Sequence, residues 1–419
     1  MEAQSWGDFK SNSALYKKEK GMEFVAEFDF EQPIHMEKMR RYRLDRIDTE
    51  MEQDNLDCII TMRVDNVRYL TSFRPNSPNL FYYFRYAAVK AKGEKPWALV
   101  ASGDYDRAIT YMPWLEKKVK PLPMDPMLSV QRFNEVFDEL GLHKGARIGI
   151  DEMSFQLFQV FREKFPDYEF VDGRNTFAKS KSIKSKEEVY LIKKACAIAE
   201  AGTQVAIDNL RPGLTEIEVS AMIHNEMILR GSEGGHTHPT QVNSGENAET
   251  LVRFPTERII RNGDFVLMDV GCCYNGYHSD YCRTIMAGNP IKNEQKKVYT
   301  AVYDATMAAL EACKPGSYTT DIDEASRDVL RKAGYEKYWY FGVTGHATGT
   351  ALQEAPIIGE ASAKGEKPWR IEPGMVFCIE PSVHLPGIGG VRIEDMVVIT
   401  EDGFELLTQT EYEDRLLVR

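Results

Sequence analysis

The second half of the chain carries charged side chains inside its most apolar, strand-like runs. Asp269 lies within the run 265–270, and Glu380 ends the run 376–380. A buried carboxylate is costly unless it is paired or bound to a metal ion. We therefore expect these strands to fold around a polar centre, and this requirement constrains the fold more than any other feature of the chain.

Three further residues have the same character. Asp280 follows Asp269 by eleven positions, and the turn-like stretch 274–277 between them allows two antiparallel strands to bring both carboxylates together. His346 lies between two glycines, and Glu394 ends the apolar run that begins with a Gly-Gly pair. Four carboxylates and one imidazole are ligands that suit Mn, Fe, Co or Zn. If they converge, they predict a centre of two divalent metal ions.

The length and charge of the chain limit the number of domains and the kinds of partner that we expect. A chain of 419 residues is too long for one ordinary core, so we expect two domains. Its net charge of −12 argues against nucleic acid and anionic membranes as partners. No apolar run approaches the roughly 20 residues that span a bilayer, and residues 1–21 lack the apolar core of a signal peptide.

The cysteines indicate a compartment rather than a metal site. Seven cysteines are scattered along the chain, their number is odd, and no pair has C-x-x-C spacing. This usage is typical of reduced thiols in a cytoplasm. We therefore predict a cytoplasmic protein without a zinc–thiolate site.

Hydrophobic periodicity divides the chain into three parts. Residues 1–35 form a polar extension, residues 36–178 a first domain, and residues 186–419 a second domain, with a basic, serine-rich linker at 179–186. Alternating strands and helices in the first domain indicate an α/β fold. The expected helices are 36–53 and 129–140, and the expected strand-like runs are 56–62, 67–73, 86–90, 96–100 and 146–151.

The second domain opens with a helix expected at 187–210, and two of its segments are alike. Residues 211–218 and 314–323 each contain Pro-Gly, then a threonine expected to cap a helix and an acidic residue three positions later. In the first segment, Thr215 and Glu218 predict a capping box. The likeness fits an internal duplication, with a metal site between two half-domains, but many helix–turn–helix connections look similar.

The order and spacing of the five residues resemble those of the creatinase / aminopeptidase P / prolidase family, peptidase family M24, which has the "pita-bread" fold. The resemblance is strong from about residue 185 to the end and looser over 36–175. It is carried by the runs 66–73, 244–247, 263–269, 276–280, 379–381 and 389–395. It implies an α/β (α+β) fold with a creatinase-like N-terminal domain and a pita-bread catalytic domain.

The resemblance also implies a role for each residue. Asp269 would chelate one ion, His346 and Glu380 the other, and Asp280 and Glu394 would bridge both. A hydroxide between the ions would be the nucleophile, because metal coordination lowers the pKa of water. Glu380 would take and return the proton. Family members are commonly dimers, so a homodimer is expected.

Two positions depart from the family pattern. Peptidases of the family carry one histidine where this chain has Val252, and a second, in a His-Glu-x-Pro motif, where it has Gln353. Those imidazoles hold the scissile carbonyl and stabilise the oxyanion. Valine offers no hydrogen bond, whereas glutamine can donate one, so Gln353 remains a candidate catalytic donor. Arg392 is expected to neutralise a neighbouring carboxylate from just outside the ligand set.

Other side chains are candidates for the substrate pocket. His238 precedes the Ser-Gly turn and His384 follows Glu380 by four residues, so either could replace a missing imidazole. Tyr82 and Tyr83 belong to an aromatic stretch that could close over the active site of a neighbouring subunit.

Three functions remain open. The first is a dinuclear metal-dependent hydrolase that cleaves a C–N bond in a small molecule or short peptide, the Xaa-Pro peptidases being the family default. The second is a metal-dependent lyase, because the runs 39–43 and 399–403 resemble the dimethylsulfoniopropionate lyases of the superfamily. That branch has an extra aspartate two residues after Asp269, which this chain lacks. The third is a non-catalytic pita-bread binding module.

Overall fold

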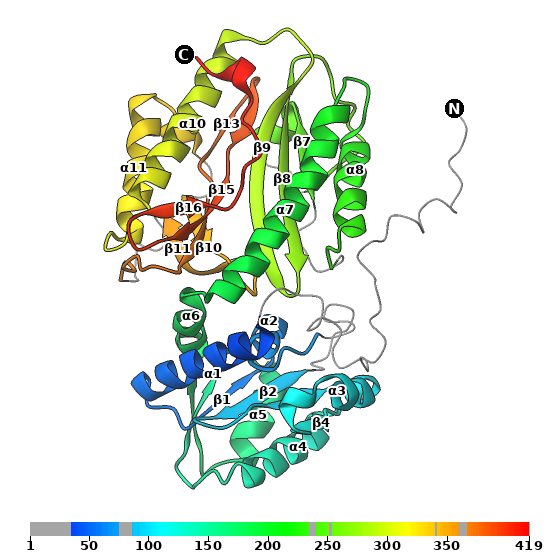
Figure 1. The fold of residues 1–419 in the computed structure, drawn as a ribbon, viewed down its shortest axis with the longest axis vertical. Coiled ribbons are helices and arrows are strands. Elements are labelled where there is room, and N and C mark those ends of the chain that lie inside the picture. Colours follow the sequence, from blue (N-terminus) through cyan, green and yellow to red (C-terminus); the bar gives the residue numbers. More distant parts are fainter. Residues whose placement is uncertain are drawn as a thin grey trace, which may run out of the picture.

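The protein is described by a computed structural model over residues 35–74, 86–233, 240–250, 254–339, 342–359 and 367–418. Helices and strands are interspersed along these ranges, as an α/β fold requires. Figure 1 shows two parts, the earlier residues around one sheet and the later residues around the others, with α6 and the start of α7 at the junction between them. Within the described ranges, no helix combines the length and the apolar character needed to cross a membrane.

The N-terminal part is built on a six-stranded mixed sheet in the order β4-β3-β2-β1-β5-β6. Its strands are β1 (Cys58–Thr61), β2 (Ala87–Ala91), β3 (Trp97–Val100), β4 (Val119–Pro121), β5 (Arg147–Ile150) and β6 (Glu169–Asp172). Its helices are α1 (Met36–Gln53), α2 (Val64–Thr71), α3 (Tyr105–Tyr111), α4 (Pro126–Glu139), α5 (Phe155–Lys164) and α6 (Arg174–Ser182). Strands β1 to β3 are completely buried, because helices and loops cover both faces of the sheet.

Two expectations for this part were wrong. The run 67–73, which the sequence pattern predicts to be strand-like, forms most of helix α2, and this helix ends where Ser72 adopts a left-handed φ of 57°. Val67 and Leu70 are buried one helical turn apart, a spacing that fits a short helix as well as a strand. The supposed linker is also partly helical, because α6 continues to Ser182 and buries Phe177 against the first core.

The C-terminal part contains three sheets. Their strand orders are β7-β8-β9, β11-β10-β12-β15-β16 and β13-β14. The strands are β7 (Gln241–Ser244), β8 (Asp264–Tyr274), β9 (Tyr277–Ala287), β10 (Val343–Ala347), β11 (Glu354–Gly359), β12 (Val376–Ile379), β13 (Ser382–Leu385), β14 (Gly389–Arg392), β15 (Asp395–Ile399) and β16 (Phe404–Leu406). The helices are α7 (Lys186–Asn209), α8 (Glu216–Leu229), α9 (Glu246–Glu249), α10 (Asn293–Ala312) and α11 (Thr319–Lys332).

A long hairpin and two helix pairs set the architecture of this part. Asn275 and Gly276 both have positive φ, as the tight turn joining β8 to β9 requires. Helix α7 packs on β8 and β9 and pairs with α8, while α10 pairs with α11, which packs on β10 and β11 (Figure 1). An isolated bridge between Cys282 and Glu394 joins the hairpin to the segment before β15.

The two similar segments begin helices α8 and α11. Thr215 caps α8, and Glu218 completes the predicted capping box. Helix α11 starts two residues earlier than expected, with Tyr318 rather than Thr320 at the cap and Asp321 accepting from the backbone N–H of Tyr318. The second threonine cap was therefore wrong. In α11 the carboxylate of Asp321 still accepts from the residue at the cap, but the Asp321 N–H donates to the Tyr318 backbone carbonyl rather than to a cap side chain.

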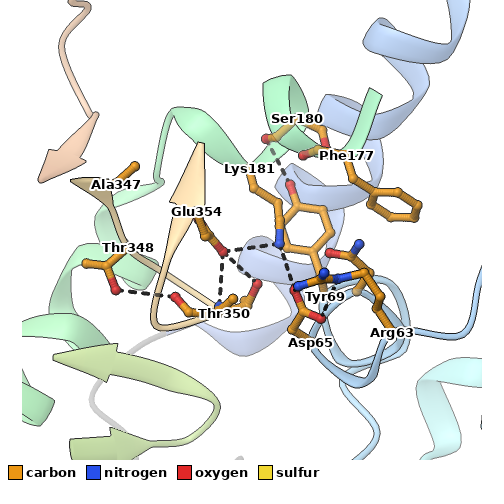
Figure 2. Close-up of polar contacts among 12 residues, drawn as sticks. Arg63, Asp65, Tyr69, Phe177, Ser180, Lys181, Ala347, Thr348, Thr350 and Glu354 are labelled. Carbon is orange, nitrogen blue, oxygen red and sulfur yellow. Dashed lines mark hydrogen bonds and ion pairs between the residues drawn. The ribbon is translucent and has the colours of Figure 1, made fainter. Parts of the chain in front are cut away.

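A buried ion-pair network ties the two parts together, and Figure 2 shows Lys181 at its centre. Lys181 Nζ on α6 lies 3.0 Å from Asp65 Oδ2 on α2 and 3.2 Å from Glu354 Oε1 on β11. Lys184 Nζ lies 3.2 Å from Glu354 Oε2. Burial would raise the pKa of both carboxyl groups, but the surrounding cations outweigh it and lower each pKa to about 2.

Replacing Lys181 should destabilise the protein, because Lys181→Met leaves Asp65 and Glu354 buried with less compensating charge. Breaking a buried ion pair by removing one partner costs about 3 kcal/mol. We expect a loss of that order in the free energy of unfolding, measured by urea denaturation at neutral pH. Lys144→Met is the matched control, since Lys144 pairs with Asp167 on the exposed surface and should change stability little.

The loss of stability in Lys181→Met should depend on pH in a defined way. Both carboxyl groups have folded-state pKa values below their ordinary values of 3.8 and 4.5, so the network stabilises the fold above those values and stops doing so as the pH falls toward about 2. The stability gap between wild type and Lys181→Met should therefore be largest near neutrality and narrow in acid. A gap that stays constant down to acidic pH would contradict this assignment.

Candidate metal centre

The five sequence-predicted residues come from five different segments of the C-terminal part. Asp269 and Asp280 face each other from adjacent strands, since Asp280 pairs with Gly271, two residues beyond Asp269. His346 comes from β10, and Glu380 follows β12, where its backbone N–H donates to Thr344 O at 2.8 Å. Glu394 lies between β14 and β15. All five positions are buried or half-buried.

Their donor atoms form one cluster. The ligand atoms of Asp280, His346 and Glu394, together with Cys378 Sγ, all lie within 4.8 Å of one another. His346 Nε2 is 3.6 Å from Asp280 Oδ2 and 3.4 Å from Glu380 Oε1. The carboxyl group of Asp269 faces that of Asp280. The expectation that these distant residues meet in space agrees with this geometry.

The charge in the cluster is unbalanced. Arg392 Nη1 lies 2.6 Å from Asp269 Oδ2 and 3.6 Å from Glu380 Oε2, so it neutralises neighbouring carboxylates as expected from the sequence. It is the one cation paired with the four carboxylates among the described residues. Burial, followed by repulsion from the other carboxylates, raises the pKa of Asp280 and Glu394 well above the ordinary range.

The backbone orients the imidazole. His346 Nδ1 lies 3.0 Å from Ala347 O, a contact that requires the proton on Nδ1. Nε2 is therefore left as the acceptor, and it faces the carboxylates. This is the tautomer that a histidine needs in order to ligate through Nε2.

Two supporting groups were missed at the sequence level. Arg283 Nη2 lies 2.7 Å from Asp395 Oδ1, both completely buried, and Arg283 Nη1 donates to Glu394 O at 2.8 Å. Met396 Sδ accepts from the backbone N–H of Asp280 at 3.1 Å. Asp395 and Met396 directly follow Glu394, and Arg283 lies in the same strand as Asp280, so their proximity could have been inferred from the strand pairing alone.

The Ser-Gly motif at 244–247 has a structural role here. Glu216 of α8 is completely buried and accepts hydrogen bonds from Ser244, Asn247 and Thr256. One carboxylate therefore fixes both ends of the segment that contains position 252.

The structure places the predicted substrate-pocket residues in different surroundings. Gln353 is exposed and directly precedes the buried Glu354 at the start of β11. His384 lies on β13 with Nδ1 2.6 Å from Ala248 O, and burial lowers its pKa to about 4, so it is neutral near pH 7. His238, Val252, Tyr82 and Tyr83 lie outside the described residues.

Comparisons with known proteins agree on one family. Residues 190–401 match metallopeptidase family M24, and residues 43–182 match the creatinase/prolidase N-terminal domain. The chain is 31% identical over 373 residues to an Xaa-Pro dipeptidase of Pyrococcus furiosus, which covers 88% of this chain and 99% of that protein. It is 32% identical over 268 residues to an Xaa-Pro dipeptidase of Lactobacillus helveticus, covering 64% and 71% of the two chains.

Solved structures give the same result. A prolidase from Thermococcus sibiricus superposes with a TM-score of 0.77 at 27% identity, covering 89% of this chain and 98% of that one. The prolidase from Pyrococcus furiosus superposes with a TM-score of 0.71 at 29% identity, covering 87% and 99%. The creatinase-like N-terminal domain and the pita-bread domain expected from the sequence are confirmed. The chain belongs to metallopeptidase family M24 and is a metal-dependent hydrolase.

Proposed function

We propose that this protein hydrolyses the peptide bond that precedes proline in Xaa-Pro dipeptides, using two divalent metal ions held by Asp269, Asp280, His346, Glu380 and Glu394. The observation that carries the proposal is the convergence of three buried carboxylates, the half-buried Glu380 and one imidazole on one small space. The relatives named Xaa-Pro dipeptidase or prolidase support the substrate class.

The residues present fit a dinuclear centre. Among the described residues, neither Glu394 oxygen has a hydrogen-bond partner, and Asp269 Oδ1 has none either, although both side chains are almost completely buried. Buried carboxylate oxygens without partners are costly, and divalent cations would remove both the repulsion and the unmet hydrogen-bonding capacity. When bound, such ions would polarise the substrate carbonyl and lower the pKa of a coordinated water.

The chain's own groups would orient substrate and move protons. The Glu380 side chain is 12% exposed, against 2% for His346 and 3% for Asp269, so among these three it is the group most open to a bound substrate. We assign it proton transfer to the leaving amine. Arg392 holds the Asp269 carboxylate in place, and the Gln353 amide could donate to the carbonyl oxygen.

The other functions have less support. The matches are to dipeptidases and prolidases, which does not favour the lyase. All five ligand-type residues are present and meet in space, which does not favour a non-catalytic module. The choice among Mn, Fe, Co and Zn, the homodimer and the cytoplasmic location remain predictions.

The first test combines a substrate assay with the loss of one bridging carboxylate. We expect proline release from Xaa-Pro dipeptides in the presence of divalent metal, and no release of acrylate from dimethylsulfoniopropionate. Asp280→Asn keeps the side-chain shape but removes the charge, so turnover and the metal content measured by elemental analysis should both fall sharply. Asp304→Asn, on the exposed side of α10, is the control. Unchanged turnover in Asp280→Asn would refute the role given to Asp280.

A second test uses the stability of the metal-free protein. Glu394→Gln removes one of the mutually repelling buried charges, so it should raise the free energy of unfolding in the presence of a chelator by roughly 2 kcal/mol. The same variant should lose most of the rise in melting temperature that metal gives the wild type. The exposed Glu405→Gln should do neither. A normal metal-induced rise in Glu394→Gln would show that Glu394 is not a ligand.

A third test restores a group that the pocket lacks. Gln353→His places an imidazole where related peptidases have one, and one oxyanion donor is worth about 10²–10³ in rate. We expect kcat/KM for Xaa-Pro dipeptides to rise at least tenfold. Gln156→His, on the exposed face of α5, should leave it unchanged. A fall in kcat/KM in Gln353→His would mean that the glutamine is itself the preferred group.

A further inference from the structure

One cysteine belongs to the cluster of candidate metal ligands. Cys378 lies on β12 directly opposite His346 on β10, and opposed residues of antiparallel strands project from the same face. Its Sγ is within 4.8 Å of ligand atoms of Asp280, His346 and Glu394. Glu380 follows two residues later and so faces the same side of the strand. The sulfur therefore points into the space that the carboxylates line.

The sulfur also differs from four of the other six thiols. Four thiols donate hydrogen bonds to acceptors outside the cluster: Cys58, Cys196, Cys273 and Cys313. Within the described part of the chain, no hydrogen bond engages Cys378 Sγ. The nearby oxygens of Glu394, a residue only 1% exposed, also have no partner there. A completely buried thiol and carboxylate therefore lie close together, and neither has a hydrogen-bond partner among the residues that the structure describes.

Two other sulfur atoms near the cluster are less suited to bind an ion. Met396 Sδ already accepts from Cys196 at 3.4 Å and from the backbone N–H of Asp280 at 3.1 Å. Cys282 pairs with Asp269 across the β8–β9 hairpin, but its sulfur does not belong to the group of mutually close donor atoms. Among the described residues, this leaves Cys378 as the sulfur placed to meet a shared ion.

We propose that Cys378 Sγ is a sixth protein ligand of the centre, bound to the ion that His346 holds, and that it makes the site prefer Zn²⁺ or Co²⁺ to Mn²⁺. The inference rests on the proposed metal centre and specifies its chemistry. The thiol releases its proton to solvent as the sulfur binds the ion, and no electron transfer is involved. The expectation that the cysteines take no part in metal binding is revised for this one residue.

The preference follows from the nature of the donor. Carboxylate oxygens suit Mn²⁺, whereas thiolate and imidazole favour the softer late first-row ions. A family centre made of carboxylates and one imidazole accepts several metals, and a sulfur ligand on one side would narrow that choice. Complete burial of the thiol also protects it from oxidants in the absence of metal.

X-ray absorption at the zinc edge tests the proposal directly. The zinc-loaded wild type should show a sulfur shell at about 2.3 Å beside nitrogen and oxygen at about 2.0–2.2 Å. The Co²⁺ form should show a sulfur-to-metal charge-transfer band in the near ultraviolet. Cys378→Ser should lose both signals, and Cys378→Ala provides a second variant if serine perturbs folding. Cys313→Ser, which changes a buried thiol outside the cluster, should keep both signals.

Metal competition supplies a second readout. Removing an outer-shell partner already costs 10- to 100-fold in metal affinity, so removing a direct ligand should lower Zn²⁺ affinity by at least about tenfold. Mn²⁺ affinity should change little, and the Zn²⁺/Mn²⁺ preference should fall accordingly.

The outcomes separate this inference from the proposed function. A wild-type protein that binds no metal would overturn both. Bound zinc with nitrogen and oxygen neighbours only, or a sulfur shell that disappears in Cys282→Ser and persists in Cys378→Ser, would overturn the role of Cys378 and leave the peptidase proposal standing.

Discussion

The repulsion among four carboxylates enclosed in one small space is the constraint on which this structure depends. Asp269, Asp280, Glu380 and Glu394 come from segments up to 125 residues apart in the chain, and Arg392 is the cation that the described residues pair with them. An arrangement of like charges in a low-dielectric interior costs free energy that the surrounding fold has to supply. A protein retains such an arrangement of like charges where the charges bind a cation. The geometry of the cluster therefore carries more functional information than any single residue in it.

The fold meets this cost with rigid backbone and buried polar support. The long β8–β9 hairpin fixes two of the carboxylates by strand register, and the completely buried Arg283–Asp395 pair holds the backbone at Glu394. These supports do not reduce the repulsion; they prevent the side chains from moving apart to escape it. Such preorganisation is what a metal site requires, because ligands already held in place need little rearrangement when an ion binds.

Much of this arrangement could be predicted from the sequence, and the failures have physical reasons. An acidic residue in an apolar strand must find a partner, so the carboxylates could be recognised before their positions were known. The run 67–73 could not be assigned by pattern, because Val67 and Leu70 fit one short helical turn as well as a strand. The sequence does not single out Cys378, because a cysteine among apolar residues is expected in the hydrophobic core. Only the pairing of Cys378 with His346 shows which face of the sheet it occupies. Side-chain identity indicates which chemistry is possible, whereas strand pairing decides which groups share a site.

The backbone at Gln353 is held in place independently of which side chain stands there. Its neighbour Glu354 is held by Lys181 and Lys184, two lysines at the junction with the N-terminal part, and accepts from Thr350 and Ala351 in the loop before it. This network fixes the backbone beside Gln353 whatever side chain stands there. The backbone of this loop is therefore held in place independently of the side chain at position 353. If Gln353 faces the substrate as proposed, its replacement of an imidazole changes the hydrogen-bonding and proton-transfer chemistry of the site without changing the framework that holds it. A difference of that kind alters the rate or the preferred substrate of an enzyme and leaves its metal centre and its fold unaffected.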